Sequence, residues 1–476
     1  MAKGVPKLAT GMASLDHLLD GGLPQGRTTL VVGAPGAGKT VFALQILANA
    51  ARRGVPSVFV TFEEGEDEIL VNAASFTWDP SDLVGDGLTF VDGRVTIEAM
   101  VTGSFELDGL ISGLAAMGDS GAAQCVVLDG LDQILANLPD VSRRRAELYR
   151  LLNVLSERRM TTLVTAKGDD EGLIASADDS FMQFAAHAVI ALRRRTATGA
   201  MVRTLQVLKY RGSSFTGSEV PYIIDDQGIT AALVGRSNLD HHLTRERVAT
   251  GVPDLDRVLE GGYLRGSTTM LSGAPGTAKT TLAASFALAA AARGETVLFV
   301  AFDESFEQVV LDMHSLGLAL DREDVRAHVH GLSLSALGVT AEEHYIHIRR
   351  LVATLNPDVL VIDPVSALFK GYDSPRAHGV AERLVDMVKA TGITTVLTSL
   401  VDPDNAVTTS SVSTLADTWI ALNYVLNGNV RGRSLSVVKA RGTQHSHEVF
   451  ALELGRDGVS VTGMPPDTPR VGPPLR

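Results

Sequence analysis

Hydrophobic and polar residues alternate along this chain in blocks that predict strands and helices in succession. Short continuous apolar runs, typical of parallel strands buried on both faces, are separated by longer helical segments such as 40–54, which Gly54 closes. The strand runs lie at 28–36, 57–64, 124–130 and 161–167, and again at 296–304, 358–364 and 394–400. The alanine-rich segment 281–294 is too short for a membrane span and is interpreted as a buried helix.

The order of predicted strands and helices occurs twice along the chain. The segment "TGMASLDHLLDGGLPQGRTTLVVGAPGAGKT" begins at Thr10, and "TGVPDLDRVLEGGYLRGSTTMLSGAPGTAKT" begins at Thr250. The offset stays at 240 residues (250 − 10 = 240) as far as Glu64 and Glu304. A shared register of this length indicates tandem homologous domains. We predict a first domain at 5–235, a polar strand-free linker at 236–249, a second domain at 250–455 and a proline-rich disordered tail at 456–476.

The first half contains a complete phosphate-binding loop between a predicted strand and a predicted helix. The motif G-x-x-x-x-G-K-[ST] spans Gly33, Gly36, Gly38, Lys39 and Thr40. In this context, backbone N–H groups cradle phosphate oxygens at the helix N-terminus. The lysine reaches the β and γ phosphates, and the threonine hydroxyl holds Mg²⁺.

The second half has one departure from the motif. Its loop consists of Gly273, Gly276, Thr277, Ala278, Lys279 and Thr280. Ala278 replaces a glycine, but it stands at the opening of the helix, where we expect alanine to be accommodated, whereas Gly273 and Gly276 hold the sharper turns. The alternative is a degenerate copy that binds nothing. The intact Lys279 and Thr280 favour a competent ATP site.

Acidic residues end the neighbouring strands at the edge where an α/β sheet binds ligands. Asp129 and Asp363 end apolar strands at matching points and are candidate Mg²⁺ ligands, directly or through water. A lone acid there often only caps a turn, but two at matching points favour the metal role.

Two acid pairs end the strand that follows each phosphate-loop helix. They are Glu63-Glu64 and Asp303-Glu304, at identical offsets. A carboxylate at this place can orient an attacking water or take a proton from a hydroxyl. The alternative is that both pairs are ordinary surface acids. Their repetition at identical offsets favours a catalytic role.

Together these motifs resemble the KaiC family of circadian-clock ATPases and autokinases, over about residues 5–455. The resemblance implies an α/β fold of two tandem RecA-like domains with mainly parallel central sheets, and a homohexamer stacked as a double ring. It also implies that K-x-R-G segments contact ATP bound to the neighbouring subunit. These cations are Lys209 and Arg211 in the first half, and Lys439 and Arg441 in the second.

The resemblance further implies phosphorylation sites in "SVSTLADTWIALNY". The matching acceptor pair is Ser413-Thr414, with Thr408 at a further family threonine, and the second-ring ATP would supply the phosphate. The family places the general base at Asp303, where this chain has an acid one methylene shorter than glutamate. The alternative interpretation is that this segment is an ordinary hydroxyl-rich loop that is not phosphorylated.

Partners follow from the same resemblance. The tail after the second domain is shorter than the family's segment that binds KaiA, which makes KaiA doubtful; KaiB-like proteins and histidine kinases or response regulators are the candidates. The main alternative functions are a RecA- or DnaB-like DNA-dependent ATPase and a nucleotide-gated scaffold without kinase activity. The candidate DNA-gripping loops 168–181 and 402–414 contain no Lys or Arg, which argues against DNA.

The composition and charge of the chain limit the classes of partner and site that are expected. The 476 residues are 45% hydrophobic and 20% charged, with a formal net charge of −13, so no global attraction to nucleic acid or an anionic membrane is expected. The single Cys125 lies in an apolar run and is expected to be a buried hydrophobe. The N-terminal segment "MAKGVPKLATG" lacks the hydrophobic core of a signal peptide, so the cytoplasm is the expected compartment. The histidine pairs at 344/347 and 445/447 lack further ligands nearby, so no metal beyond nucleotide-bound Mg²⁺ is expected.

Overall fold

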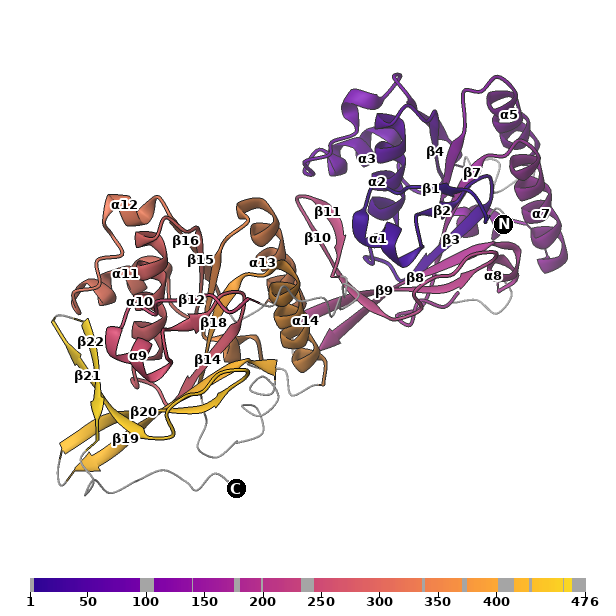
Figure 1. The fold of residues 1–476 in the computed structure, drawn as a ribbon. Coiled ribbons are helices and arrows are strands. Elements are labelled where there is room, and N and C mark those ends of the chain that lie inside the picture. Colours follow the sequence, from indigo (N-terminus) through magenta and orange to yellow (C-terminus); the bar gives the residue numbers. More distant parts are fainter. Residues whose placement is uncertain are drawn as a thin grey trace. The chain divides into compact units, whose positions relative to one another are not determined.

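The computed structural model describes residues 4–94, 107–138, 140–174, 180–197, 200–232, 244–335, 339–369, 375–400, 415–427, 430–456 and 458–464. Contacts divide the chain into two units, Met1–Leu233 and Val234–Arg476, and each holds one copy of the repeat (Figure 1). Each unit is therefore described by itself. Within the described residues, none of the helices has both the length and the apolar character needed to cross a lipid bilayer.

The first unit is built around a nine-stranded sheet with the order β11-β10-β9-β8-β3-β7-β6-β4-β5. Its elements are β1 (Lys7–Leu8), α1 (Ala13–Leu18), β2 (Leu23–Pro24), β3 (Thr28–Gly33), α2 (Lys39–Arg52), β4 (Ser57–Thr61), α3 (Glu66–Ala73), η1 (Ser81–Leu83), β5 (Leu88–Asp92), α5 (Asp108–Asp119), β6 (Cys125–Asp129), α6 (Leu131–Leu135), α7 (Val141–Glu157), β7 (Thr161–Lys167), α8 (Phe181–Ala185), β8 (Ala188–Ala197), β9 (Ala200–Tyr210), β10 (Val220–Asp225) and β11 (Gly228–Ala231). The pairs from β5 to β8 along this order are parallel, and the pairs from β8 to β11 are antiparallel.

The second unit repeats the plan with the order β16-β15-β17-β18-β14-β19-β20-β21-β22. Its elements are β12 (Arg247–Val248), α9 (Pro253–Val258), β13 (Tyr263–Leu264), β14 (Thr268–Gly273), α10 (Lys279–Ala292), β15 (Val297–Phe302), α11 (Phe306–His314), α12 (Glu323–Arg326), β16 (Val329–Leu334), α13 (Ala341–Leu355), β17 (Val359–Asp363), η3 (Val365–Phe369), α14 (Pro375–Thr391), β18 (Thr394–Leu400), β19 (Thr418–Asn427), β20 (Val430–Ala440), β21 (Val449–Gly455) and β22 (Gly458–Gly463). The expected α/β class with mainly parallel central sheets is confirmed in both units.

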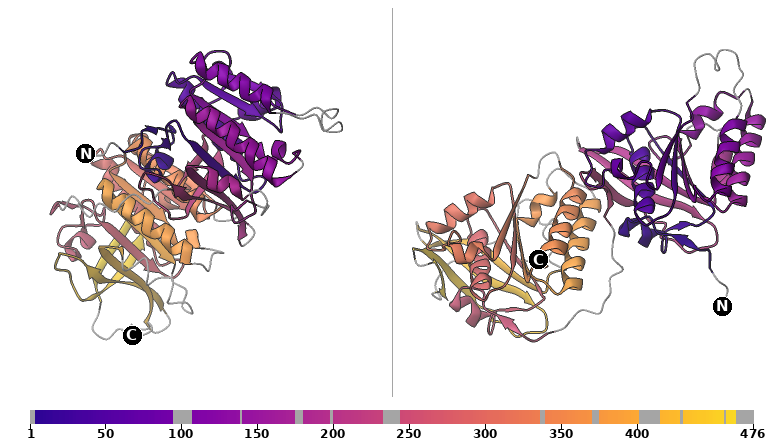
Figure 2. Two further views of the ribbon diagram at one scale, coloured as in Figure 1. Left: turned by 90° about the vertical axis from the view of Figure 1, so that its right-hand side faces the viewer. Right: turned by 90° about the horizontal axis from the view of Figure 1, so that it is seen from above.

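Helices cover both faces of each central sheet, which explains why its strands are apolar throughout. In the first unit, Val31 packs into the core on the side of α2, whereas Leu30 and Val32 pack into the core on the side of α5 and α7 (Figure 1). In the second unit, α9 and α10 lie on one face and α13 and α14 on the other (Figure 2). Successive side chains of a strand point to opposite faces, so a strand buried on both sides carries no polar alternation. Cys125 is fully buried in this core, as expected, and burial raises the pKa of its thiol to about 12.

Two predicted boundaries were wrong in detail. Residues 247–248, placed in a strand-free linker, form β12 and pair with β13 of the second unit. Residues 458–463, placed in a disordered tail, form β22, which pairs with β21 and buries Val461. In both places a short strand is stabilised by pairing with a neighbouring strand. The surrounding sequence is polar or proline-rich, so the sequence pattern alone did not indicate a strand.

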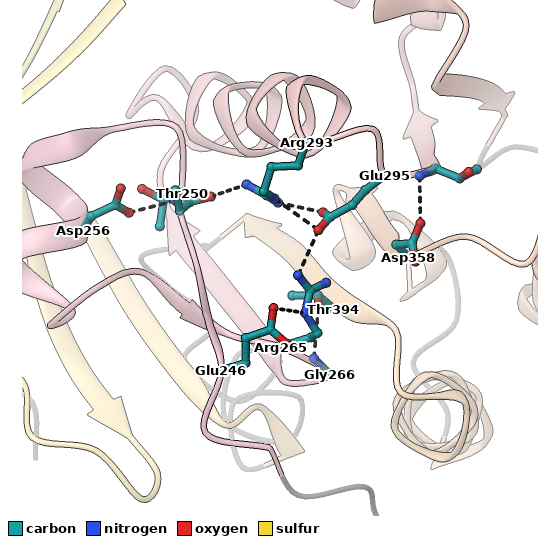
Figure 3. Close-up of polar contacts among 11 residues, drawn as sticks. Glu246, Thr250, Asp256, Arg265, Gly266, Arg293, Glu295, Asp358 and Thr394 are labelled. Carbon is teal, nitrogen blue, oxygen red and sulfur yellow. Dashed lines mark hydrogen bonds and ion pairs between the residues drawn. The ribbon is translucent and has the colours of Figure 1, made fainter.

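An ion-pair network fixes the chain entering the second unit to its sheet (Figure 3). Arg265 joins two carboxylates, with Nε 2.8 Å from Glu246 and Nη2 3.0 Å from Glu295. Arg293, just past α10, contacts Glu295 at 2.8 Å and also donates to the carbonyl of Ala249 at 3.1 Å. Although burial alone raises the pKa of Glu295, the hydrogen bonds from Arg293 and Arg265 outweigh it and hold that pKa below its usual range. Glu295 is therefore the centre of this network.

We expect Glu295→Gln to destabilise the second unit by about 1–2 kcal/mol, because two guanidinium groups lose their charged acceptor. The pKa of Glu295 is lowered by folding, so its contribution is present above the unfolded pKa and disappears as pH falls through the folded pKa. Urea unfolding measures the change in stability. Hydrogen exchange of peptides from 280–300 shows whether the change lies at this network. Arg257→Gln, which removes the exposed pair with Asp254, is the matched control and should change stability by less than about 0.5 kcal/mol. Equal effects of the two substitutions would contradict the central role of Glu295.

Candidate functional site

The first phosphate loop joins β3 to α2, and its glycines are required for two different reasons. Gly36 and Gly38 have φ angles of 76° and 85°, in the left-handed region that favours glycine. A Cβ on Gly33 would lie 2.5 Å from the carbonyl oxygen of Leu192, so this position needs glycine for space. Lys39 Nζ donates to the carbonyl oxygens of Gly33 at 2.9 Å and Ala34 at 3.4 Å. The loop thus wraps around an ammonium group at the helix N-terminus, as a phosphate cradle requires.

The second loop has the same shape, including the position where glycine is replaced. Ala278 has φ 80° and ψ 25°, close to the 85° and 28° of Gly38. The alanine is accommodated in the left-handed conformation that ordinarily favours glycine, and its methyl group packs in the core. Lys279 Nζ donates to the carbonyl oxygens of Gly273 and Ala274 at 2.9 and 2.8 Å. Strain at Ala278 has not changed the loop geometry.

Burial lowers the pKa of both loop lysines, but their surroundings differ. Around Lys39, the carboxylates of Glu63, Asp129 and Asp132 oppose this shift. Lys279 is 6% exposed, and burial lowers its pKa to about 8, whereas the carboxylate of Asp363 acts against this fall. The first ammonium therefore sits in a more acidic environment than the second.

The strand-end acids lie beside the loops and are held by hydroxyl groups. Thr40 Oγ1 donates to Asp129 Oδ2 at 2.9 Å, and Thr165 Oγ1 donates to Asp129 Oδ1 at 2.6 Å. Burial raises the pKa of Asp129, and the two hydroxyl bonds act against that rise. In the second unit Thr398 donates in the same way to Asp363, which is 8% exposed. A threonine hydroxyl and a carboxylate in contact fit Mg²⁺ that is also bound to phosphate oxygens.

The first acid pair follows the end of β4, in the turn to α3. Glu63 Oε1 accepts a hydrogen bond from Gln133 Nε2 at 3.1 Å. A Cβ on Gly130 would lie 2.9 Å from the Glu63 side chain, so the glycine after Asp129 leaves room for this carboxylate. The backbone carbonyl of Glu64 accepts from Thr61 Oγ1 at 2.7 Å. The structure brings Glu63, rather than Glu64, into electrostatic contact with Lys39.

The second acid pair is presented differently. Asp303 has a positive φ of 68°, although it is not a glycine. Partial burial raises the pKa of Glu304, and the neighbouring Asp363, Asp312 and Asp303 raise it further. In the second unit, Glu304 therefore interacts electrostatically with the strand-end aspartate Asp363.

The four K-x-R-G cations lie away from the phosphate loop of their own unit. Lys209 pairs with Val189, which pairs with Leu30, three residues before Gly33. The Lys209 backbone is therefore roughly 10 Å along the sheet from the end of β3. Lys209 Nζ donates to the carbonyl oxygens of residues 183, 184 and 186 at 2.8, 3.2 and 2.6 Å. Arg211 follows it at the same end.

The second unit repeats this placement. Lys439 pairs with Trp419, which pairs with Met270, three residues before Gly273. Lys439 Nζ donates to the Ala416 carbonyl at 2.7 Å, and Arg441 lies two residues further on. The predicted acceptors 408, 413 and 414 lie outside the described residues.

Several polar residues of the site were missed by sequence reasoning. Thr165 and Thr398 occupy matching places in β7 and β18, so the repeat held a signal for them. Asp132 and Gln133 lie in α6, and their proximity to Glu63 appears only when Gly130, with φ 78°, turns the chain. Within the described ranges, no group of three or more His, Cys, Asp or Glu residues is arranged to hold a metal ion.

Comparisons with known proteins agree with this geometry. The family model described as "ATPase: KaiC" matches twice, over residues 8–232 and 248–465. The circadian clock protein KaiC2 of Synechocystis sp. is 34% identical over 464 residues, covering 96% of this chain and 81% of the relative. The circadian clock oscillator protein KaiC of Parathermosynechococcus lividus is 31% identical, covering 96% of this chain and 86% of the relative. The circadian clock protein KaiC3 of Synechocystis sp. is 30% identical, covering 98% of this chain and 95% of the relative.

Exchange of glycine and alanine should cost more stability in the first loop than in the second. Gly38→Ala should destabilise the first unit by about 1–2 kcal/mol, because the left-handed conformation is costly for alanine and the new Cβ would lie 2.5 Å from Ile224 Cδ1. Ala278→Gly relieves that cost but removes a packed methyl group, so its effect should stay within about 1 kcal/mol. Urea unfolding of each variant, followed by hydrogen exchange of peptides from α2 and α10, measures both changes. A larger loss in Ala278→Gly than in Gly38→Ala would contradict this account.

ATP affinity of the second site should fall as pH rises. With a pKa of about 8, Lys279 in the free site is charged in roughly nine-tenths of molecules at pH 7 and one-tenth at pH 9. In a Lys39→Ala chain, which leaves the second site to bind, we expect Kd for ATP to rise roughly tenfold over this range. Calorimetry at both pH values measures it. Lys279→Arg, whose charge does not titrate, should show a flat profile, and a flat profile in the parent chain would refute the prediction.

Proposed function

The chain belongs to the KaiC family of ATPases, and from that premise we propose that its first domain hydrolyses ATP slowly while its second domain is a serine/threonine autokinase. The observation that carries the proposal is the duplicated arrangement of a phosphate loop, a loop lysine withdrawn from solvent (half-buried in the first unit, buried in the second) and a strand-end aspartate held by a threonine. These residues fit Mg-ATP in both units. Bound Mg²⁺ would neutralise phosphate charge, with Thr40 and Asp129, and Thr280 and Asp363, as the residues that hold it.

In the first domain, Glu63 is the candidate general base. Its carboxylate faces Lys39 and is oriented by Gln133. The oxygen of an attacking water forms a bond to the γ-phosphorus as the bond from that phosphorus to the bridging oxygen of ADP breaks. The proton of the water passes to Glu63. Glu64 is a weaker candidate, because Thr61 contacts its backbone carbonyl rather than its carboxylate.

In the second domain the acceptor is a hydroxyl of Ser413 or Thr414. Its oxygen attacks the γ-phosphorus, ADP leaves, and its proton passes to Asp303 or Glu304. The raised pKa of Glu304 and its interaction with Asp363 make it a candidate equal to Asp303.

The transfer is proposed to occur between two copies of the chain. Asp417, three residues after Thr414, accepts from the Thr268 amide at 3.0 Å, at the start of β14. The chain therefore enters β19 at the sheet end opposite its own loop, the end that also carries Lys439. A neighbouring copy would supply ATP, and the K-x-R-G cations Lys209, Arg211, Lys439 and Arg441 would contact the neighbour's phosphates in a homohexameric double ring.

The biological role that fits is a component of a clock or of a signalling switch, with KaiB-like proteins or histidine-kinase systems as candidate partners. A scaffold without kinase activity would assemble with ATP but stay unphosphorylated. A DNA-dependent ATPase would bind DNA in a salt-dependent way.

Mass spectrometry after incubation with Mg-ATP tests the kinase. We expect phosphate on Ser413 or Thr414, reduced roughly 100-fold in Lys279→Ala and retained in Lys39→Ala, the matched control. Mixing Lys279→Ala chains with chains carrying Ser413→Ala and Thr414→Ala tests the direction. Phosphate on the first partner would then come from the second. An unphosphorylated wild-type chain with ATP bound would refute the kinase and leave an ATPase whose second domain senses nucleotide.

A further inference from the structure

The first nucleotide site contains a carboxylate whose second oxygen has no structural task. Asp132 lies in α6, just after Asp129 and the turn at Gly130. Its Oδ2 accepts the backbone N–H of Lys167 at 3.2 Å. Lys167 ends β7 and pairs with Gly33, the first residue of the phosphate loop. Asp132 thus stands at the sheet edge where β3, β6 and β7 end together.

The other oxygen, Oδ1, is buried, and no other residue that the structure describes donates a hydrogen bond to it. Buried acceptors in proteins are normally paired with a donor of the protein or with water. The charged groups that face the carboxylate are Glu63 and Lys39, which belong to the catalytic arrangement. Burial raises the pKa of Asp132, so holding a carboxylate here costs free energy that a neutral residue would avoid.

The second domain shows that the structural task needs no acid. Ser366 occupies the matching place, three residues after Asp363, and its Oγ accepts the N–H of Leu400 at 3.1 Å. Leu400 ends β18 and pairs with Gly273, as Lys167 pairs with Gly33. A hydroxyl therefore suffices to hold the strand end beside a phosphate loop. The charge and the second oxygen of Asp132 are additions confined to the first domain.

We propose that Asp132 is a positioning residue for ATP hydrolysis in the first site, where its Oδ1 accepts a hydrogen bond from the water that Glu63 activates. Two acceptors on one water fix the direction of its lone pair toward the γ-phosphorus better than Glu63 alone. The second site has Ser366 here and lacks this acceptor. It holds water less firmly, which suits a site that transfers phosphate to a hydroxyl. This inference rests on the hydrolytic role proposed for the first domain.

The test measures steady-state ATP hydrolysis by full-length chains that also carry Lys279→Ala, so that turnover comes from the first site. Asp132→Ser installs the residue of the second domain and retains a partner for the Lys167 amide. Asp132→Asn keeps the size and loses the charge. We expect kcat to fall about tenfold in both variants, with KM and the affinity for a non-hydrolysable ATP analogue within about twofold.

Three results would overturn the proposal, and they are distinguishable. Unchanged kcat in both variants would show that Asp132 does not position the water. A fall in kcat accompanied by a matching rise in KM and a lower unfolding temperature would reduce Asp132 to a structural residue. Absence of turnover in the Lys279→Ala reference chain would instead refute hydrolysis by the first domain, and the role of Asp132 with it.

Discussion

An ammonium group enclosed by a backbone loop, half-buried at Lys39 and buried at Lys279, is the feature on which both nucleotide sites depend. Burial lowers the pKa of Lys39 and Lys279, because removal from water disfavours the charged form. Each ammonium is kept charged by the oxygen atoms that face it, which are loop carbonyls in this structure and would be phosphate oxygens in a complex. The parallel sheet supplies the remaining groups. Because the carboxyl ends of neighbouring strands meet at one edge, a loop, a strand-end aspartate and a threonine converge without long-range adjustment.

The two copies of this arrangement differ in the carboxylates that act on the loop lysine, and this difference is consistent with the separate activities proposed for the two domains. Three carboxylates act on Lys39, whereas Asp363 is the acid that acts on Lys279. An acid-rich site offers several acceptors for water, which hydrolysis needs. The repeat therefore preserves the loop and the strand-end aspartate, whereas the carboxylates that act on the loop lysine differ between the two units.

Much of this arrangement could be predicted from sequence because it depends on local order. The loops, the strand-end aspartates and the parallel sheets all follow from motif spacing and apolar runs. What could not be predicted depends on backbone angles or on contacts between distant segments. Thr165 looks like an ordinary β-branched strand residue until Asp129 is placed beside it. Asp132 and Gln133 look like surface positions of a short helix until the left-handed Gly130 turns them toward Glu63. The short strand β22 could not be predicted from its own sequence, because it is stabilised by pairing with β21.

The second site also concentrates unusual backbone conformations. Ala278 and Asp303 both have positive φ, at 80° and 68°, although neither is glycine, and both adjoin the phosphate site. At the first of these places the first domain uses Gly38, and Glu63, which matches Asp303, is not among its positive-φ residues. Left-handed conformations of such residues cost roughly 1–2 kcal/mol each and persist only where the surroundings enforce them. At Ala278 the enforcement is visible, since its methyl group is packed in the core. Asp303 is followed by Glu304, whose pKa is raised by partial burial and by Asp363, Asp312 and Asp303. The altered loop residue is thus tolerated by packing, and the altered acid pair differs from that of the first unit in its backbone conformation.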